Sequence, residues 1–200
     1  MTSAPASRRT LLAVGALAAA LTLSACTGDA NGRSGGGGDT NFVTGTGGIS
    51  TVPKGERMAA PQLSGKDITG KPLDLADYKG KVVVLNLWGS WCAPCRAEAP
   101  YLTRIAEETR SKGVEFVGIN TRDPQTGPAL AFEKDYDVRY PSFHDPIGKL
   151  ILKFPKGSLN PQAIPSTIVI DREGKIAARA LTALDDKQLR SMIDPVVAEK

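Results

Sequence analysis

The stretch KVVVLNLWGSWCAPCRAEAP, residues 81–100, decides the fold because it joins a strand pattern directly to a helix pattern. Lys81–Leu87 is rich in β-branched residues and has the length of a buried strand. Apolar positions then recur at helical spacing and predict a helix over Ala93–Lys112. These positions are Ala97, Tyr101, Ile105 and Thr109. Cys92 and Cys95 therefore stand where a strand turns into a helix.

Further stretches on both sides of this strand and helix also predict regular structure. They are a hairpin within Gln62–Leu75, a strand Val114–Ile119, a helix Pro128–Tyr136, strands Ile168–Ile170 and Lys175–Ala180, and a closing helix from Asp185 with Leu189, Ile193 and Val197 on one face. This order predicts an α/β fold in which helices cover both sides of a central mixed sheet.

The first 25 residues have the pattern of a secretory signal peptide. A positive start at Arg8–Arg9 precedes the apolar run Leu11–Leu23, which is too short for a comfortable membrane span. Small residues at Ser24–Ala25 suit cleavage. Leu23–Cys26 resembles a bacterial lipobox, which implies a diacylglycerol on the Cys26 thiol, cleavage before that residue and anchoring in a membrane. The alternative is an ordinary secreted protein with a stray cysteine.

The region 26–57 is predicted to be the lipidated cysteine and a disordered linker, because it is rich in Gly, Ser, Thr, Asn and Asp. A flexible coil of this length reaches roughly 30 Å and would act as a tether. The folded domain is then predicted over 58–200. Ser7–Leu12 also resembles a twin-arginine export signal, but paired arginines are common in ordinary signals, so the export route stays open.

Composition limits the remaining chain to one globular domain, since 200 residues with 41% apolar content bury a single core beside a short terminal segment. The formal net charge of +4 falls to +2 once Arg8 and Arg9 leave with the signal peptide. So mild and scattered a charge argues against nucleic acid as a partner.

Cys92 stands at the amino end of the predicted helix, where unpaired backbone N–H groups favour a thiolate. Cys95 lies one turn further in and is expected to be the less exposed of the two sulfurs. Pro94 suits the first turn because its missing N–H has no partner there anyway. A disulfide across so small a loop stabilises the fold by only roughly 2 kcal/mol, so it serves better as a reversible redox couple than as a staple.

Three other uses of these cysteines fit less well. A structural zinc site needs about four ligands, and the domain offers two cysteines and the single His144. A copper-delivery protein normally spaces its cysteines more widely, and His144 lies in a segment expected to be loop-rich. A peroxidase calls for a Thr three residues before the reactive cysteine, where Gly89 stands.

WCAPC after a strand, followed some 70 residues later by Ile164–Thr167, resembles the thioredoxin superfamily. Within it, the chain is similar to the TlpA/ResA-like, membrane-tethered thiol-disulfide oxidoreductases. The resemblance covers residues 58–200 and includes an extra N-terminal β-hairpin, which ends in Asp77–Lys81 and is absent from ordinary thioredoxins. It implies a thioredoxin-like fold.

The resemblance also implies roles for individual residues. Cys92 matches the nucleophile that attacks a substrate disulfide, and Cys95 matches the thiol that resolves the mixed disulfide. Pro165 matches a cis-proline beside the cysteine pair, and the backbone of Ile164 would bind an extended substrate segment. Trp91 would form an apolar wall at the site; the alternative is a core aromatic.

Glu98 follows Cys95 by three residues, so both side chains are expected on one face of the helix. It matches an acidic residue of ResA-like proteins that exchanges protons with the cysteines. The alternative is a solvated surface charge. Pro100, inside the same helix, is expected to kink it.

The implied function is that of an extracytoplasmic, lipid-anchored monomer without a cofactor, which reduces apocytochrome c cysteines for cytochrome c biogenesis. Its electrons would come from a transmembrane CcdA-type partner. Sequence leaves the direction of electron flow open, because the potential depends on the stability of both redox states. A disulfide-forming oxidase of the same fold and a copper-delivery module are the alternatives.

Overall fold

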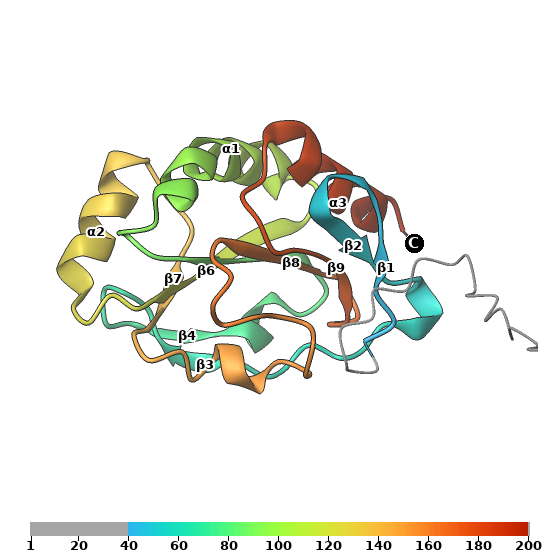
Figure 1. Ribbon diagram of the computed structural model, residues 1–200, viewed down its shortest axis with the longest axis horizontal. Helices are drawn as coiled ribbons and strands as arrows, with labels where there is room; N and C mark the ends of the chain where they lie inside the picture. Colours follow the sequence, from blue (N-terminus) through green and yellow to red (C-terminus); the bar gives the residue numbers. More distant parts are fainter. Residues whose placement is uncertain (1–39, 200) are drawn as a thin grey trace, which may run out of the picture. The chain divides into compact units, whose positions relative to one another are not determined.

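The computed structural model describes residues 40–199 of the chain (Figure 1). The predicted signal peptide, Cys26 and residues 27–39 lie outside the described residues. The strands are β1 Val43–Thr44, β2 Ile49–Thr51, β3 Ser64–Lys66, β4 Pro72–Asp74, β5 Val82–Trp88, β6 Val114–Thr121, β7 Ser142–Asp145, β8 Ser166–Ile170 and β9 Ile176–Ala180. The α-helices are α1 Ala93–Arg110, α2 Thr126–Asp135 and α3 Asp186–Ala198.

Seven of these strands form one mixed sheet in the order β1-β2-β9-β8-β5-β6-β7. β6 runs parallel to its neighbours β5 and β7, whereas β8 is antiparallel to β5 and to β9. β5 is therefore an interior strand between β8 and β6, buried on both faces, and the chain passes from its carboxyl end into α1. The prediction of a central mixed sheet with helices is confirmed.

The two faces of the sheet are covered differently (Figure 1). Val82 and Val84 of β5 pack with α1 and α3, and Trp88, on the same face, packs with α2. The alternate residues Val83 and Leu85 pack with the β3–β4 hairpin and with the irregular segment before β8. Among residues 40–199 the α-helices thus cover one face, and the prediction of helices on both sides is wrong for the other. Its cover includes two short 3-10 turns, η3 Leu75–Tyr78 and η4 Ile151–Lys153.

The predicted hairpin within Gln62–Leu75 is present as β3 and β4, which pair antiparallel. Asp67 shapes the turn, since its carboxylate accepts hydrogen bonds from the backbone N–H groups of Thr69 and Lys71. Gly70 supplies the positive φ of 87° that the turn requires. The hairpin lies against the sheet because Leu63 is fully buried in the core of that face.

The prediction of a disordered linker up to residue 57 is wrong for residues 40–57. β2 pairs with the edge of β9, and β1 pairs with β2. Phe42 and Val52 are each only 3% exposed. The segment holds few apolar residues, but Phe42, Ile49 and Val52 are buried. Pairing of β2 with β9 also satisfies backbone groups whatever the side-chain composition. The folded domain thus begins by residue 40 and not near Met58.

Two local predictions also need correction. Ala97 and Tyr101 are exposed on α1, because steps of four residues drift away from a face that repeats every 3.6 residues. The buried residues of α1 are Cys95, Glu98, Ala99, Leu102, Ile105 and Thr109. His144, expected in a loop, lies on β7. α1 continues through the exposed Pro100.

None of the described helices is long and apolar enough to span a membrane.

Candidate active site

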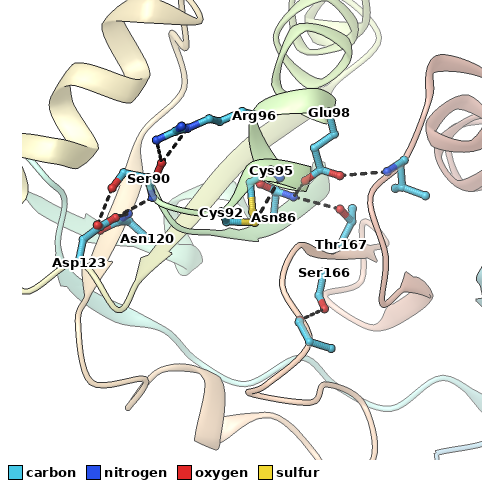
Figure 2. The surroundings of a disulfide bond; sticks show 12 residues. Asn86, Ser90, Cys92, Cys95, Arg96, Glu98, Asn120, Asp123, Ser166 and Thr167 are labelled. Carbon is cyan, nitrogen blue, oxygen red and sulfur yellow. Dashed lines mark hydrogen bonds between the residues drawn. A yellow bond between two sulfur atoms is a disulfide. The ribbon is translucent and has the colours of Figure 1, made fainter.

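The two cysteines lie where the chain passes from β5 into the first turn of α1 (Figure 2). Cys92 is the N-cap residue and forms a disulfide with Cys95, with 5.3 Å between the two Cα atoms. The predicted pairing is confirmed. Cys95 is 1% exposed and Cys92 is 3% exposed, so both are buried and Cys95 is slightly the deeper.

The amino end of α1 supplies a hydrogen-bond donor to the first cysteine. The backbone N–H of Cys95 points at the Cys92 sulfur, with 3.2 Å between nitrogen and sulfur. In the reduced protein the same group, together with the partial positive charge of the helix end, stabilises a thiolate at Cys92. A stabilised thiolate both attacks disulfides and leaves readily in exchange.

Glu98 is buried behind the cysteines, with 1% of its surface exposed. Its carboxyl group accepts hydrogen bonds from Asn86 Nδ2 at 2.8 Å and from the backbone N–H of Leu184 at 3.0 Å. Burial raises the pKa of Glu98 to about 7, although both hydrogen bonds act to lower it. The reading of Glu98 as a solvated charge is therefore wrong, and the group can hold or release a proton near neutral pH.

Asn86 links the carboxyl group to the opposite wall of the site (Figure 2). Its Nδ2 also donates to Thr167 Oγ1 at 3.2 Å, two residues after Pro165. Asn86 and Cys95 both line a small internal cavity of about 10 Å³, close to the volume that one water molecule needs. Asn86 was not predicted as a site residue, although a single polar residue within the apolar run KVVVLNL indicates a special role.

The segment before β8 brings the remaining predicted residues to the cysteines. The Ile164–Pro165 peptide bond is cis, which confirms that prediction. Ile164 packs against the cluster that contains Cys92 and Cys95. Among the described residues, no backbone hydrogen bond joins Ile164 to another residue, so its backbone groups remain available for a substrate.

Trp91 is 48% exposed, which excludes a core aromatic. Its indole covers Gly89 so closely that a Cβ at position 89 would lie 2.8 Å from the indole Nε1. Gly89 thereby leaves room for an exposed aromatic side chain beside the cysteines. The peroxidase pattern would require a threonine at position 89 instead. The guanidinium of Arg122 lies 5.7 Å from the centre of the Trp91 ring.

His144 does not join the cysteines. Its Nε2 lies 2.9 Å from the backbone oxygen of Asp123 and donates to it. Within residues 40–199, no group of three or more His, Cys, Asp or Glu side chains is placed to hold a metal ion. The copper-delivery alternative therefore finds no ligand set in the described part of the chain.

Comparisons with known proteins agree with this geometry. Residues 57–179 match the AhpC/TSA family. The thiol-disulfide oxidoreductase ResA of Bacillus cereus is 31% identical over 137 residues, which cover 68% of this chain and 76% of that protein. ResA of Bacillus subtilis is 34% identical over 121 residues, which cover 60% of this chain and 64% of that protein.

Two solved structures are similar over nearly their whole length. A DsbF homologue from Corynebacterium diphtheriae is 36% identical with a TM-score of 0.70, and the match covers 79% of this chain and 99% of that one. A secreted thiol-disulfide isomerase from Corynebacterium glutamicum is 32% identical with a TM-score of 0.72, covering 82% and 100%. With a cysteine pair at the amino end of α1, the chain therefore belongs to the AhpC/TSA family and is a thioredoxin-like, ResA-related thiol-disulfide oxidoreductase.

Proposed function

We propose that this oxidoreductase works as a reductase outside the cytoplasm and keeps the cysteines of apocytochrome c reduced for haem attachment. The observation that carries the proposal is the buried Glu98, which shares the site with the cysteines and whose pKa lies at about 7. A reductase must take up the proton of its resolving thiol during each turnover, and a carboxyl group with this pKa can do so at neutral pH.

The residues support a two-step reduction of a substrate disulfide. The Cys92 thiolate attacks one substrate sulfur, and the other leaves as a thiolate. The Cys95 thiol then gives its proton to Glu98, which lies one helical turn further along the buried side of α1. The Cys95 thiolate attacks the Cys92 sulfur, which restores the Cys92–Cys95 disulfide and releases the second substrate thiolate. Two electrons have passed from the cysteine pair to the substrate.

The proposed location depends on the sequence features before residue 40. A lipid on Cys26 would hold the domain at the outer face of the cell membrane, where a CcdA-type membrane protein would return electrons to the disulfide. Because the folded domain begins by residue 40, the tether is at most residues 27–39. Labelling with radioactive palmitate should mark the full chain and leave the Cys26→Ala variant unlabelled; equal labelling would contradict the anchor.

A disulfide-forming oxidase is the second candidate, favoured by the similarity to the DsbF homologue and the secreted isomerase of Corynebacterium. Redox titration of the protein against glutathione or dithiothreitol buffers separates the two. A reductase should have a midpoint potential near that of thioredoxin, about −270 mV, and an oxidase should lie near about −120 mV. A value at the second figure would overturn the reductase.

The substrate class needs its own experiment. The reduced protein should reduce an oxidised C-x-x-C-H peptide, and the Cys92→Ser variant should leave it oxidised. A peptide with the histidine replaced is the matched control for recognition. Failure to reduce the haem-site peptide, while insulin is still reduced, would overturn apocytochrome c as substrate and leave the reductase activity intact.

A further inference from the structure

The turn that leads into Cys92 is held by a buried carboxylate from another part of the chain (Figure 2). Asp123 follows β6 and is 3% exposed. Its carboxylate accepts the backbone N–H of Ser90 at 2.9 Å and the Ser90 hydroxyl at 2.6 Å. It also accepts a hydrogen bond from Asn120 Nδ2 at 2.6 Å, which fixes the carboxylate itself.

An arginine holds the same residue from the other side. Arg96 lies one helical turn after Cys92, and its Nε and Nη2 donate to the backbone oxygen of Ser90 at 2.9 and 2.6 Å. The N–H, the hydroxyl and the carbonyl of Ser90 are therefore all engaged. Figure 2 shows Arg96 and Asp123 reaching Ser90 from opposite directions.

Ser90 occupies a position from which it can control the nucleophile. The backbone N–H of Cys92 donates to the Gly89 oxygen at 3.1 Å, so Gly89–Cys92 is a tight turn with Ser90 and Trp91 at its centre. A shift of Ser90 would rotate the backbone of Cys92 and move its sulfur away from the N–H of Cys95. Turns are among the more mobile parts of a fold unless such contacts restrain them.

We propose that Asp123 and Arg96 are positioning residues that clamp Ser90, and that this clamp keeps the Cys92 sulfur against the amino end of α1 in both redox states. The inference concerns thiol-disulfide exchange itself and is independent of the substrate and of the direction of electron flow. It adds Ser90 from just before α1, Arg96 from the start of α1 and Asp123 from the loop after β6 to the residues that serve the site.

A purely electrostatic role for the same residues makes a different prediction. The Asp123 carboxylate disfavours a nearby thiolate and the Arg96 guanidinium favours it, so their removal by Asp123→Asn and Arg96→Gln would shift the Cys92 thiol pKa in opposite directions. A clamp predicts that both substitutions shift the pKa of the Cys92 thiol in the same direction. Loss of either partner frees Ser90, weakens the contact with the helix end and raises the thiol pKa in both variants.

The other charged groups around the turn are the same in the parent protein and in the Asp123→Asn and Arg96→Gln variants. They are Glu98 on α1, Arg122 on the loop after β6 and His144 on β7. None of them is altered by the two substitutions, so the sign of the change reports on the clamp.

The experiment measures alkylation of the reduced, full chain against pH, with modification of Cys92 followed by mass spectrometry of its peptide. At pH 7 we expect Asp123→Asn and Arg96→Gln each to slow alkylation about threefold or more, with the titration displaced to higher pH. Arg110→Gln, which removes a charge from the other end of α1, is the matched control and should leave the profile unchanged. Faster or unchanged alkylation of Asp123→Asn would overturn the clamp.

A milder variant guards against misfolding. Ser90→Ala removes only the hydroxyl donor and no charge, and it should slow alkylation in the same direction by a smaller factor. Because Ser90→Ala and Asp123→Asn both weaken the contact between the same two residues, the double variant should show less than the product of the two single effects. An unchanged Ser90→Ala profile in a protein with the normal melting temperature would contradict the proposal, as would independent effects in the double variant.

Discussion

The two ends of the central sheet use arginine in different ways. At the end opposite the cysteines, Arg57 is 6% exposed in its side chain and pairs with Asp171 at 3.0 Å and Glu199 at 2.6 Å. Beside the cysteines, Arg96 donates to a backbone carbonyl. The far end is joined by charge pairs that link distant segments, whereas the arginine at the active site holds a peptide unit in place.

The difference shows which property each end requires. Arg57 connects the segment before β3 to the residue after β8 and to the end of α3, so its loss acts on the stability of the whole domain. Arg96 and Asp123 act on a turn of four residues, so their loss acts on reactivity. Variants at the two ends should therefore separate stability from chemistry.

The largest effect is expected at the cysteines. Cys92→Ser should lower the rate of insulin disulfide reduction to background, because no thiolate remains at position 92 to attack. Cys95→Ser should accumulate mixed disulfides with substrate, since attack survives and resolution does not. Both variants should stay folded. Normal turnover by Cys95→Ser would contradict the assigned order of attack.

At the far end, Arg57→Met should lower the free energy of unfolding by about 3–5 kcal/mol, because it leaves the buried carboxylate of Asp171 and the partly buried one of Glu199 without this cation. Urea unfolding at neutral pH measures this change. The exposed Arg139, which pairs with Asp137 at the surface, provides a control, and Arg139→Gln should unfold like the parent protein. If folded Arg57→Met also altered the midpoint potential, the separation between the two ends would fail.

Glu98 is expected to affect both stability and reactivity, since it is buried in the core and lies at the active site. Its pKa rises from 4.5 to about 7 on folding, so the folded state binds more protons in that window and the free energy of unfolding falls as pH rises through it. The decrease is on the order of 3 kcal/mol.

Glu98→Gln should remove that decrease, as measured by urea unfolding at several pH values. Burial raises the pKa of Glu133 to about 7 as well, so a residual decrease should persist in both proteins, and the difference between them isolates Glu98. Identical pH dependence of the two proteins would contradict a buried, titrating carboxyl at this position.

The sequence was sufficient wherever one segment carried the whole signal. WCAPC placed the disulfide, and the spacing of three residues placed Glu98 on the buried side of α1. Ser90 and Asp123 form their contact across 33 residues, and neither belongs to a motif. β1 and β2 were not predicted because β9, the partner of β2, lies far along the chain and supplies hydrogen bonds that the local composition does not suggest.

The smallest effect is expected for Trp91, the exposed residue of the clamped turn. Trp91→Ala removes an aromatic wall that a substrate polypeptide would contact, so kcat/KM for insulin should fall about tenfold. The thiol pKa of Cys92 should stay constant, because the backbone of the turn is held through Ser90 and not through the indole. Tyr101 is also an exposed aromatic residue and lies on α1. Tyr101→Ala should leave kcat/KM unchanged. If Trp91→Ala instead displaced the alkylation profile, the indole would be part of the clamp, and the distinction between holding the nucleophile and contacting the substrate would have to be redrawn.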